Sequence, residues 1–344
     1  MSDSAKGALP TRASREREVN ACLRKALFAL LDGEFEEAEA QLAEAVRADS
    51  DAIDAYMALA RFYRGRGEIG RAIRIHQNLL LRHDVDAKAR VTVLAELAED
   101  FWAGGFLRRA VASYEEVLAH APRHTGALAA LVELLSELRE FPRGIEMSRR
   151  LGRAQKRKDP GREATLLVRM AEQEREKGLG DAARRTVKKA LRRDPKCVAA
   201  LCLLGELEAD RGRKKAALSA WQKVPELDPV AAVALYPRLE STFAALGRTR
   251  DYEAFLRRRM EARPGDRGLG LALASHLAAR GETDAALAEL EGLGDGGPGQ
   301  LEQRVAAGRI LLAAGRDGEA LKELGSLLDV LDKRQDLLDG ESLE

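Results

Sequence analysis

One glycine recurs along this chain at nearly constant spacing, between segments whose apolar residues repeat with helical periodicity. At one of these positions Arg139 replaces the glycine. With Arg139 included, successive turn positions are 34 to 39 residues apart. The turn positions are Gly33, Gly67, Gly105, Arg139, Gly178, Gly212, Gly247, Gly281 and Gly315. Self-similarity at such a period indicates a repeat architecture in which each unit packs on its neighbours. The sequence therefore predicts an all-α chain of about nine helix–turn–helix units.

Small residues also recur at two fixed distances from the turn. Five residues after it, with Tyr252 as the exception, stand Ala38, Ala72, Ala110, Gly144, Ala183, Ala217, Ala286 and Ala320. Seven residues before it stand Ala26, Ala60, Ala98, Ala171, Gly205, Ala274 and Gly308. Small residues let two helices approach closely. The pattern is typical of the tetratricopeptide repeat, so we expect a tetratricopeptide repeat solenoid, a right-handed superhelix of about nine repeats.

The repeats fill almost the whole sequence. Residues 1–17 are polar and are predicted to be a disordered lead-in, because they have little apolar surface to bury. Residues 18–328 are predicted to form the repeat array. Residues 329–344 are predicted to hold a capping helix and tail, since a solenoid needs an end with a polar outer face. The sequence shows no secretory signal and no long apolar run, so a cytoplasmic protein is expected.

No group of residues in the sequence points to catalysis or to a bound cofactor. The three cysteines are too few and too irregularly spaced for a disulfide framework or a zinc site, so reduced thiols are expected. His120 and His124 flank Pro122, which interrupts the helix that a metal-binding pair would need. His76 is expected to pack between helices. Phosphate, dinucleotide and nucleophile motifs are also missing from the sequence, so neither an enzyme nor a cofactor is expected.

One segment resembles a known protein family. Residues 64–81, RGRGEIGRAIRIHQNLLL, are similar to the second repeat of the lipopolysaccharide assembly protein B family, where an RGE-x-x-RAIRIHQ run is characteristic. Similar stretches follow in the same order at residues 97–114, 205–224 and 246–262. The resemblance extends over residues 20–290. Members of this family are bacterial inner-membrane proteins whose repeats face the cytoplasm.

The resemblance implies a regulator of lipopolysaccharide synthesis. Family members present the deacetylase that commits precursor to lipid A to a membrane-bound AAA protease. They also carry an N-terminal membrane helix and a C-terminal rubredoxin-like zinc domain. This sequence instead begins MSDSAKGALPTRAS and ends LLDVLDKRQDLLDGESLE. We therefore expect either a relative that keeps the array alone, or part of a family member located at the cytoplasmic face of the inner membrane.

Charge is unevenly distributed, although the formal net charge is only +1. Residues 139–267, the basic band, hold 32 Lys or Arg against 19 Asp or Glu. Many of the basic residues fall on second helices, which lie on the convex side in this repeat family: Arg149, Arg150, Arg153, Arg184, Arg185, Lys188, Lys189, Arg192, Arg193, Arg257, Arg258 and Arg259. Such a band suits an acidic protein or an anionic membrane surface as partner.

First helices line the concave groove in this repeat family, and their charges differ from those of the basic band. The residues predicted to bind a partner there are Arg61, Arg64, Glu99, Trp102, Glu133, Glu137, Glu172, Arg175, Glu176, Glu206 and Asp210. Six of these residues form a predicted acidic trough: Glu133, Glu137, Glu172, Glu176, Glu206 and Asp210. Their negative charges repel one another, which favours binding of a partner that relieves the repulsion. An ordinary solvated helix face is the alternative for any single residue. Trp102 is the expected apolar anchor for a peptide segment or protein surface.

These patterns favour a non-enzymatic protein–protein interaction adaptor. One alternative is a generic cytoplasmic repeat scaffold of another pathway. Another is a nucleic-acid-binding repeat protein that uses the basic band. Against nucleic acid, the basic residues are not interleaved with the aromatic side chains on which single-stranded bases stack.

Overall fold

The computed structural model describes residues 11–294, 300–325, 327 and 328. In this part of the chain every regular element is helical, and 19 helices have defined bounds. Two compact units make up the chain, residues 1–166 and 167–344. Among the helices so described, none combines the length and the apolar character that crossing a bilayer requires.

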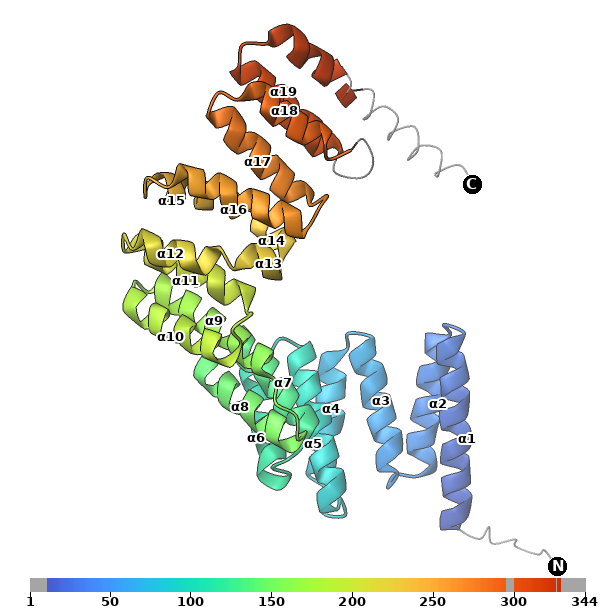
Figure 1. The fold of residues 1–344 in the computed structure, drawn as a ribbon. Helices are drawn as coiled ribbons and strands as arrows, with labels where there is room; N and C mark the ends of the chain where they lie inside the picture. Colours follow the sequence, from blue (N-terminus) through green and yellow to red (C-terminus); the bar gives the residue numbers. More distant parts are fainter. Residues whose placement is uncertain (1–10, 295–299, 326, 329–344) are drawn as a thin grey trace, which may run out of the picture. The chain divides into compact units, whose positions relative to one another are not determined.

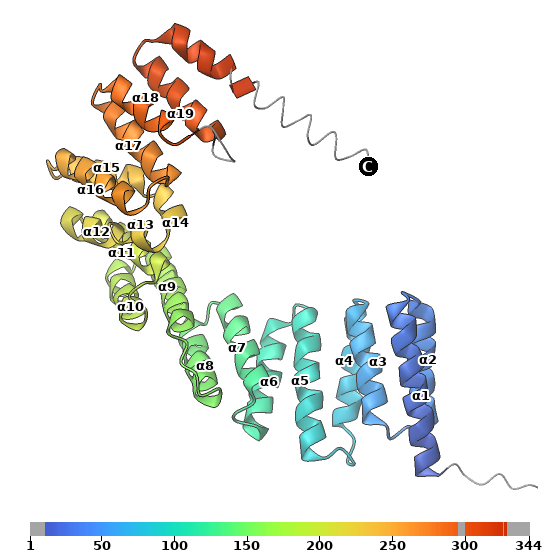
Figure 2. The ribbon, with the colours of Figure 1, turned by 45° about the vertical axis from the view of Figure 1, so that its right-hand side comes forward.

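The first unit is a series of helix pairs (Figure 1). Its helices are α1 (Arg12–Leu31), α2 (Phe35–Ala48), α3 (Ile53–Gly65), α4 (Ile69–Leu80), α5 (Ala87–Ala103), α6 (Leu107–His120), α7 (Thr125–Glu137), α8 (Phe141–Ala154) and the start of α9 (Pro160–Glu176). From α1 to α8, each odd-numbered helix packs on the even-numbered helix that follows it. Figure 2 shows α1 to α6 as successive antiparallel rods. These pairs are the first four predicted repeats.

The second unit continues the series with less regular helices. After the rest of α9 come α10 (Gly180–Arg193), α11 (Val198–Asp210), α12 (Lys214–Trp221), α13 (Val224–Leu227), α14 (Pro229–Val233), α15 (Tyr236–Ala244), α16 (Thr249–Ala262), α17 (Arg267–Ala279), α18 (Thr283–Glu291) and α19 (Gln300–Ala313). Residues 317–325 form a further helical segment. Pro225, Pro229 and Pro237 each stand in the first turn of a short helix, where a missing N–H costs no bond. The predicted all-α solenoid of nine repeats is thus confirmed in the described residues.

The turn residues adopt the backbone conformation that their spacing predicts. All eight turn glycines have φ between 68° and 84°, the left-handed region that glycine enters without strain. The amide after each turn reaches back to the first helix, as from Glu34 to the Ala29 carbonyl at 2.8 Å. Arg139 has φ of 59°, so the fourth repeat keeps the same turn without a glycine.

The recurrent small residues lie at buried helix crossings. Ala72 and Ala217 are fully buried. A Cβ built on Gly205 would lie only 2.1 Å from the indole nitrogen of Trp221, so the ring occupies the space that glycine leaves. At the exceptional position, Tyr252 is 1% exposed and its hydroxyl donates to the Tyr236 carbonyl at 3.1 Å. The small positions therefore set how closely the paired helices approach.

One predicted boundary was wrong. Helix α1 begins at Arg12, so residues 12–17 are helical and do not belong to a disordered lead-in. Thr11 caps this helix, because its side-chain oxygen accepts a hydrogen bond from the Ser14 amide at 3.3 Å. The capping helix and tail predicted for residues 329–344 lie outside the described residues.

Candidate protein-binding surface

The residues predicted to bind a partner all lie on first helices. They stand six, three or two residues before the turn, and such spacings share one face of a helix. The first unit holds Arg61, Arg64, Glu99, Trp102, Glu133 and Glu137, and the second holds Glu172, Arg175, Glu176, Glu206 and Asp210. Each unit therefore presents its own part of the predicted surface.

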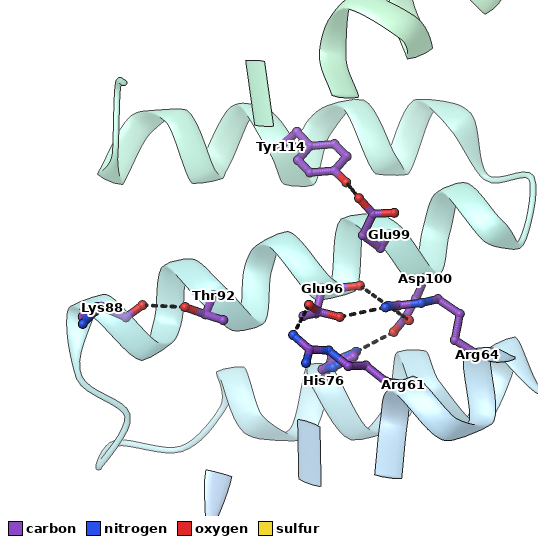
Figure 3. Close-up of polar contacts among 9 residues, drawn as sticks. All are labelled: Arg61, Arg64, His76, Lys88, Thr92, Glu96, Glu99, Asp100 and Tyr114. Atoms are coloured by element: carbon purple, nitrogen blue, oxygen red, sulfur yellow. Dashed lines mark hydrogen bonds and ion pairs between the residues drawn. The ribbon is translucent and has the colours of Figure 1, made fainter. Parts of the chain in front are cut away.

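Two of these residues in the first unit belong to a partly buried charge network (Figure 3). Arg61 and Arg64, on α3, contact the Glu96 carboxylate of α5 at 2.6 and 2.8 Å. Arg64 also contacts Asp100 at 2.8 Å and donates to the Glu96 carbonyl at 3.2 Å. The two arginines therefore join the first helices of repeats two and three, and they are engaged before any partner arrives.

The other oxygen of Asp100 faces His76, on α4. The distance from His76 Nδ1 to Asp100 Oδ2 is 2.5 Å, and neither side chain is exposed. This confirms the prediction that His76 packs between helices. Asp100 thus connects α3, α4 and α5, a role that its sequence context did not reveal.

Burial and the two arginines act on Glu96 in opposite directions. Burial disfavours the charged form and by itself would raise the pKa of Glu96. Hydrogen bonds from Arg61 and Arg64, together with their charges, outweigh burial and hold this pKa below its ordinary value of 4.5. Glu96 is therefore ionised at neutral pH, and its charge offsets that of the arginines.

Glu99 and Trp102 lie farther along α5. Glu99 is exposed and accepts a hydrogen bond from the Tyr114 hydroxyl of α6. Burial of the phenol, together with this bond to an anion, raises the pKa of Tyr114. Trp102 is partly exposed, whereas the adjacent Phe101 is buried in the repeat core. An accessible aromatic ring beside fixed charges is the kind of side chain that anchors protein interfaces.

Glu133 and Glu137 are exposed on α7. They are four residues apart, so their like charges adjoin on one helix face. Within the described residues neither carboxylate takes part in an ion pair or hydrogen bond. This part of the predicted trough carries negative charge that no ion pair among the described residues compensates.

In the second unit the chain itself neutralises part of the predicted acidic trough. Arg175, on α9, contacts Glu206 at 2.5 Å and Asp210 at 3.4 Å, both on α11. Arg238, on α15, contacts the other oxygen of Glu206. The expectation that these two carboxylates need a partner to relieve their repulsion was wrong, because arginines of the neighbouring repeats supply the positive charge.

The same charges surround a small pocket of about 260 Å³. Its walls are Arg175, Glu206, Ala209, Asp210, Trp221 and Arg238. Burial would raise the pKa of Glu206, but the hydrogen bonds from Arg238 and Arg175 outweigh it and lower this pKa. Glu172 and Glu176 are exposed on α9. The pocket therefore offers fixed, paired charges to a polar group.

The described residues contain no cluster of three or more His, Cys, Asp or Glu side chains suited to a metal ion. Cys22 is a buried free thiol, and Cys197 and Cys202 are partly buried free thiols. Burial raises the pKa of Cys22 and of Cys202, so these thiols are poor nucleophiles at neutral pH.

Fold, turn geometry and helix crossings define the class: this chain is an all-α solenoid of tetratricopeptide repeats. A family model of the tetratricopeptide repeat matches residues 168–232. A solved tetratricopeptide repeat protein from Parabacteroides merdae aligns with 86% of this chain and 99% of its own, at 14% identity and a TM-score of 0.41.

The chain is also similar to lipopolysaccharide assembly protein B, as residues 64–81 predict. It is 25% identical to the Escherichia coli K12 protein over 257 residues, which are 75% of this chain and 66% of that protein. It is 26% identical to the Haemophilus influenzae protein over 237 residues, which are 69% of this chain and 59% of that protein. The chain thus spans less than two thirds of the length of these curated relatives, 66% of one and 59% of the other.

Proposed function

We propose that this chain is a non-enzymatic adaptor in lipopolysaccharide assembly, which presents a client protein to a partner such as a membrane AAA protease. The observation that carries the proposal is the similarity to lipopolysaccharide assembly protein B over 75% of the chain. Repeat solenoids offer extended surfaces on which proteins bind. The client that the resemblance implies is the deacetylase of lipid A synthesis.

In the first unit, the proposed client contact is formed by Trp102 with Glu133 and Glu137. These side chains lie on first helices of successive repeats, and each is at least partly exposed. Uncompensated carboxylates attract positive charge, and an accessible indole offers apolar area. The matching client segment therefore carries Lys or Arg residues beside a large apolar side chain.

In the second unit, the proposed contact is the pocket between Arg175, Glu206, Asp210 and Arg238, with Glu172 and Glu176 beside it on α9. Because the charges in this pocket are paired, they attract a charged client only weakly, but they can form directed hydrogen bonds with one of its polar groups. We therefore assign this part of the surface to orienting the client after it has bound.

The proposal is tested with the purified deacetylase of the same organism, by measuring its association and dissociation rates on the immobilised chain. Trp102→Ala is expected to raise the dissociation rate about thirtyfold, as loss of an interface anchor does. The matched control is Phe28→Ala, which removes an aromatic side chain 64% exposed elsewhere in the first unit. If the parent chain does not bind the deacetylase, the deacetylase is not the client. If Trp102→Ala and Phe28→Ala have equal dissociation rates, Trp102 is not part of the contact.

A second measurement separates encounter from anchoring. The double change Glu133→Lys with Glu137→Lys is expected to slow association and to abolish its dependence on salt, because the surface charges steer the encounter. The control, Glu36→Lys with Glu116→Lys, makes the same change in net charge at exposed residues of second helices. Equal slowing in both variants would mean that net charge alone, and not this surface, attracts the client.

A further inference from the structure

Helix α10 concentrates positive charge on one side. It holds six Lys or Arg among its 14 residues and a single acid, Asp181. Its buried residues are Ala183, Thr186, Val187 and Ala190, and they pack the helix on α11. Since the apolar residues face the core, the basic residues occupy the opposite surface.

The start of α10 is paired with carboxylates of the chain itself. Arg184 contacts the buried Glu208 of α11, and Arg213 reaches the same carboxylate at 3.6 Å. Arg211 contacts Asp181. These contacts bring residues 211–213, which lead into α12, beside the start of α10. The basic start of α12 therefore adjoins the basic helix α10.

Farther along α10 three basic residues share one exposed side of the helix. Arg185, Lys189 and Arg192 are exposed, and their spacing of four and three residues places them in one stripe. In the part of the chain that the structure describes, none of the three forms an ion pair. Lys214 and Lys215, at the start of α12, are exposed too. Both helices therefore expose basic residues to solvent.

The sequence around this surface is strongly basic as well. Residues 177–223 hold 13 Lys or Arg against five Asp or Glu. Three of the five acids, Glu206, Glu208 and Asp210, belong to α11 and are engaged by arginines. In the described part of the chain these acids form no ion pair with Arg185, Lys189 or Arg192, so an external anionic surface would supply the missing negative charge.

Accessible aromatic side chains distinguish a surface for single-stranded nucleic acid from other cationic surfaces, because the bases stack on them. The tryptophan of this region, Trp221, is 3% exposed, so it cannot stack on a base. Basic residues beside a buried tryptophan therefore favour a lipid surface over a nucleic acid.

We propose that the stripe formed by Arg185, Lys189 and Arg192, on the exposed side of α10, docks on the anionic surface of a phospholipid bilayer. Clusters of four to eight Lys or Arg on an amphipathic helix bind anionic lipids in this way. The basic side chains meet the lipid phosphates. The proposal does not depend on the adaptor function.

The test is vesicle flotation of the full chain. Vesicles of phosphatidylcholine alone are compared with vesicles in which about a quarter of the lipid is phosphatidylglycerol. The parent chain is expected to float with the anionic vesicles, to stay behind with the neutral ones, and to be released by salt. Arg185→Gln, Lys189→Gln and Arg192→Gln together are expected to weaken binding about a hundredfold, at about fivefold for each basic residue.

The matched control removes the same amount of charge elsewhere. Lys25→Gln, Lys88→Gln and Arg123→Gln together replace three exposed cations of the first unit. This control is expected to bind anionic vesicles within about twofold of the parent. Equal loss in the two triple variants would overturn the proposal, because net charge alone would then explain binding. Failure of the parent to float with anionic vesicles would overturn it as well.

A further arm distinguishes lipid from other polyanions. A short DNA duplex is expected to compete poorly with the vesicles. If the duplex binds more tightly than the vesicles and loses binding in the α10 triple variant, the face is a nucleic-acid surface and the proposal is wrong. Unchanged circular dichroism of all variants establishes that each remains folded.

Discussion

His76 and Asp100 meet in the core of the first unit, where Nδ1 of the imidazole lies 2.5 Å from Oδ2 of the carboxylate. Arg64 contacts the other carboxylate oxygen at 2.8 Å. His76 lies on the second helix of repeat two and Asp100 on the first helix of repeat three, so the pair spans the junction between repeats. In a solenoid such junctions carry much of the stability, and this one is partly polar.

Removal of Asp100 is expected to destabilise this junction. Asp100→Ala leaves the Arg64 charge and a buried imidazole without their carboxylate, which should lower the free energy of unfolding by about 3 kcal/mol. Urea denaturation followed by circular dichroism measures the change. Glu133→Ala, at an exposed carboxylate of α7, is the control and should change stability by less than about 0.5 kcal/mol. Similar midpoints for both variants would mean that the network contributes little.

Acid is expected to weaken the same junction through Glu96. Its pKa is lower in the folded chain than the ordinary 4.5, so the carboxylate contributes stability above pH 4.5. That contribution is lost as the pH falls through the folded-state pKa. Melting temperatures measured between about pH 6 and pH 3 should therefore fall less steeply for Glu96→Gln than for the parent. An unchanged slope in Glu96→Gln would contradict the assignment.

Two glycines in the same register should respond oppositely to alanine. Gly205 and Gly308 each stand seven residues before their turn, in α11 and α19. Gly205→Ala places a methyl group against the Trp221 ring and should cost about 1–3 kcal/mol. A methyl group added at Gly308 would meet no atom within 4 Å among the described residues, so Gly308→Ala should be neutral or stabilise by up to about 1 kcal/mol. Thermal melts with equal shifts would contradict this difference.

The fourth turn offers a test of backbone strain. Arg139 holds φ at 59°, where an L side chain is strained by about 1–2 kcal/mol relative to glycine. Arg139→Gly is therefore expected to raise the free energy of unfolding by about 1 kcal/mol. Gly178→Ala, at φ of 75°, makes the reverse change and should lower it by a similar amount. Stabilisation by both substitutions, or by neither, would argue against strain at Arg139.

The packed alanine of repeat six should not tolerate a larger residue. Ala217 is fully buried at the crossing of α11 and α12, whereas its neighbour Ala216 is exposed. Ala217→Leu should destabilise the chain by about 1–3 kcal/mol through overpacking. Ala216→Leu adds the same atoms to the solvent side and should change stability by less than about 0.5 kcal/mol. Chemical denaturation of the two variants measures the difference. Equal midpoints would mean that Ala217 does not lie at a tight crossing of α11 and α12.

The repeats were predictable because a turn and a helix crossing each demand one kind of residue. A left-handed turn favours glycine and a tight crossing favours alanine, so Gly33 and Ala38 carry structural information that composition alone lacks. The start of α1 was less predictable. Arg12–Arg17 are polar, and their helix depends on the cap at Thr11 and on burial that begins only at Val19.

The charge network was not predictable from the sequence because its members look like solvated residues. Glu96 and Asp100 are two of many carboxylates on polar helices, and their burial depends on how α3, α4 and α5 pack. Arg238 was missed for the same reason, since its partner Glu206 lies 32 residues away on another helix. A weak signal existed in His76, whose burial demands a hydrogen-bonding partner.

Tyr252 distinguishes the seventh repeat from its neighbours. The other repeats have alanine or glycine at this position, whereas the Tyr252 ring is buried here and its hydroxyl donates a hydrogen bond to the Tyr236 carbonyl at the start of α15. Exchange of α16 for the second helix of another repeat would remove both features at once. Recombination within this gene is therefore constrained at the seventh repeat, where α15 and α16 must be inherited together.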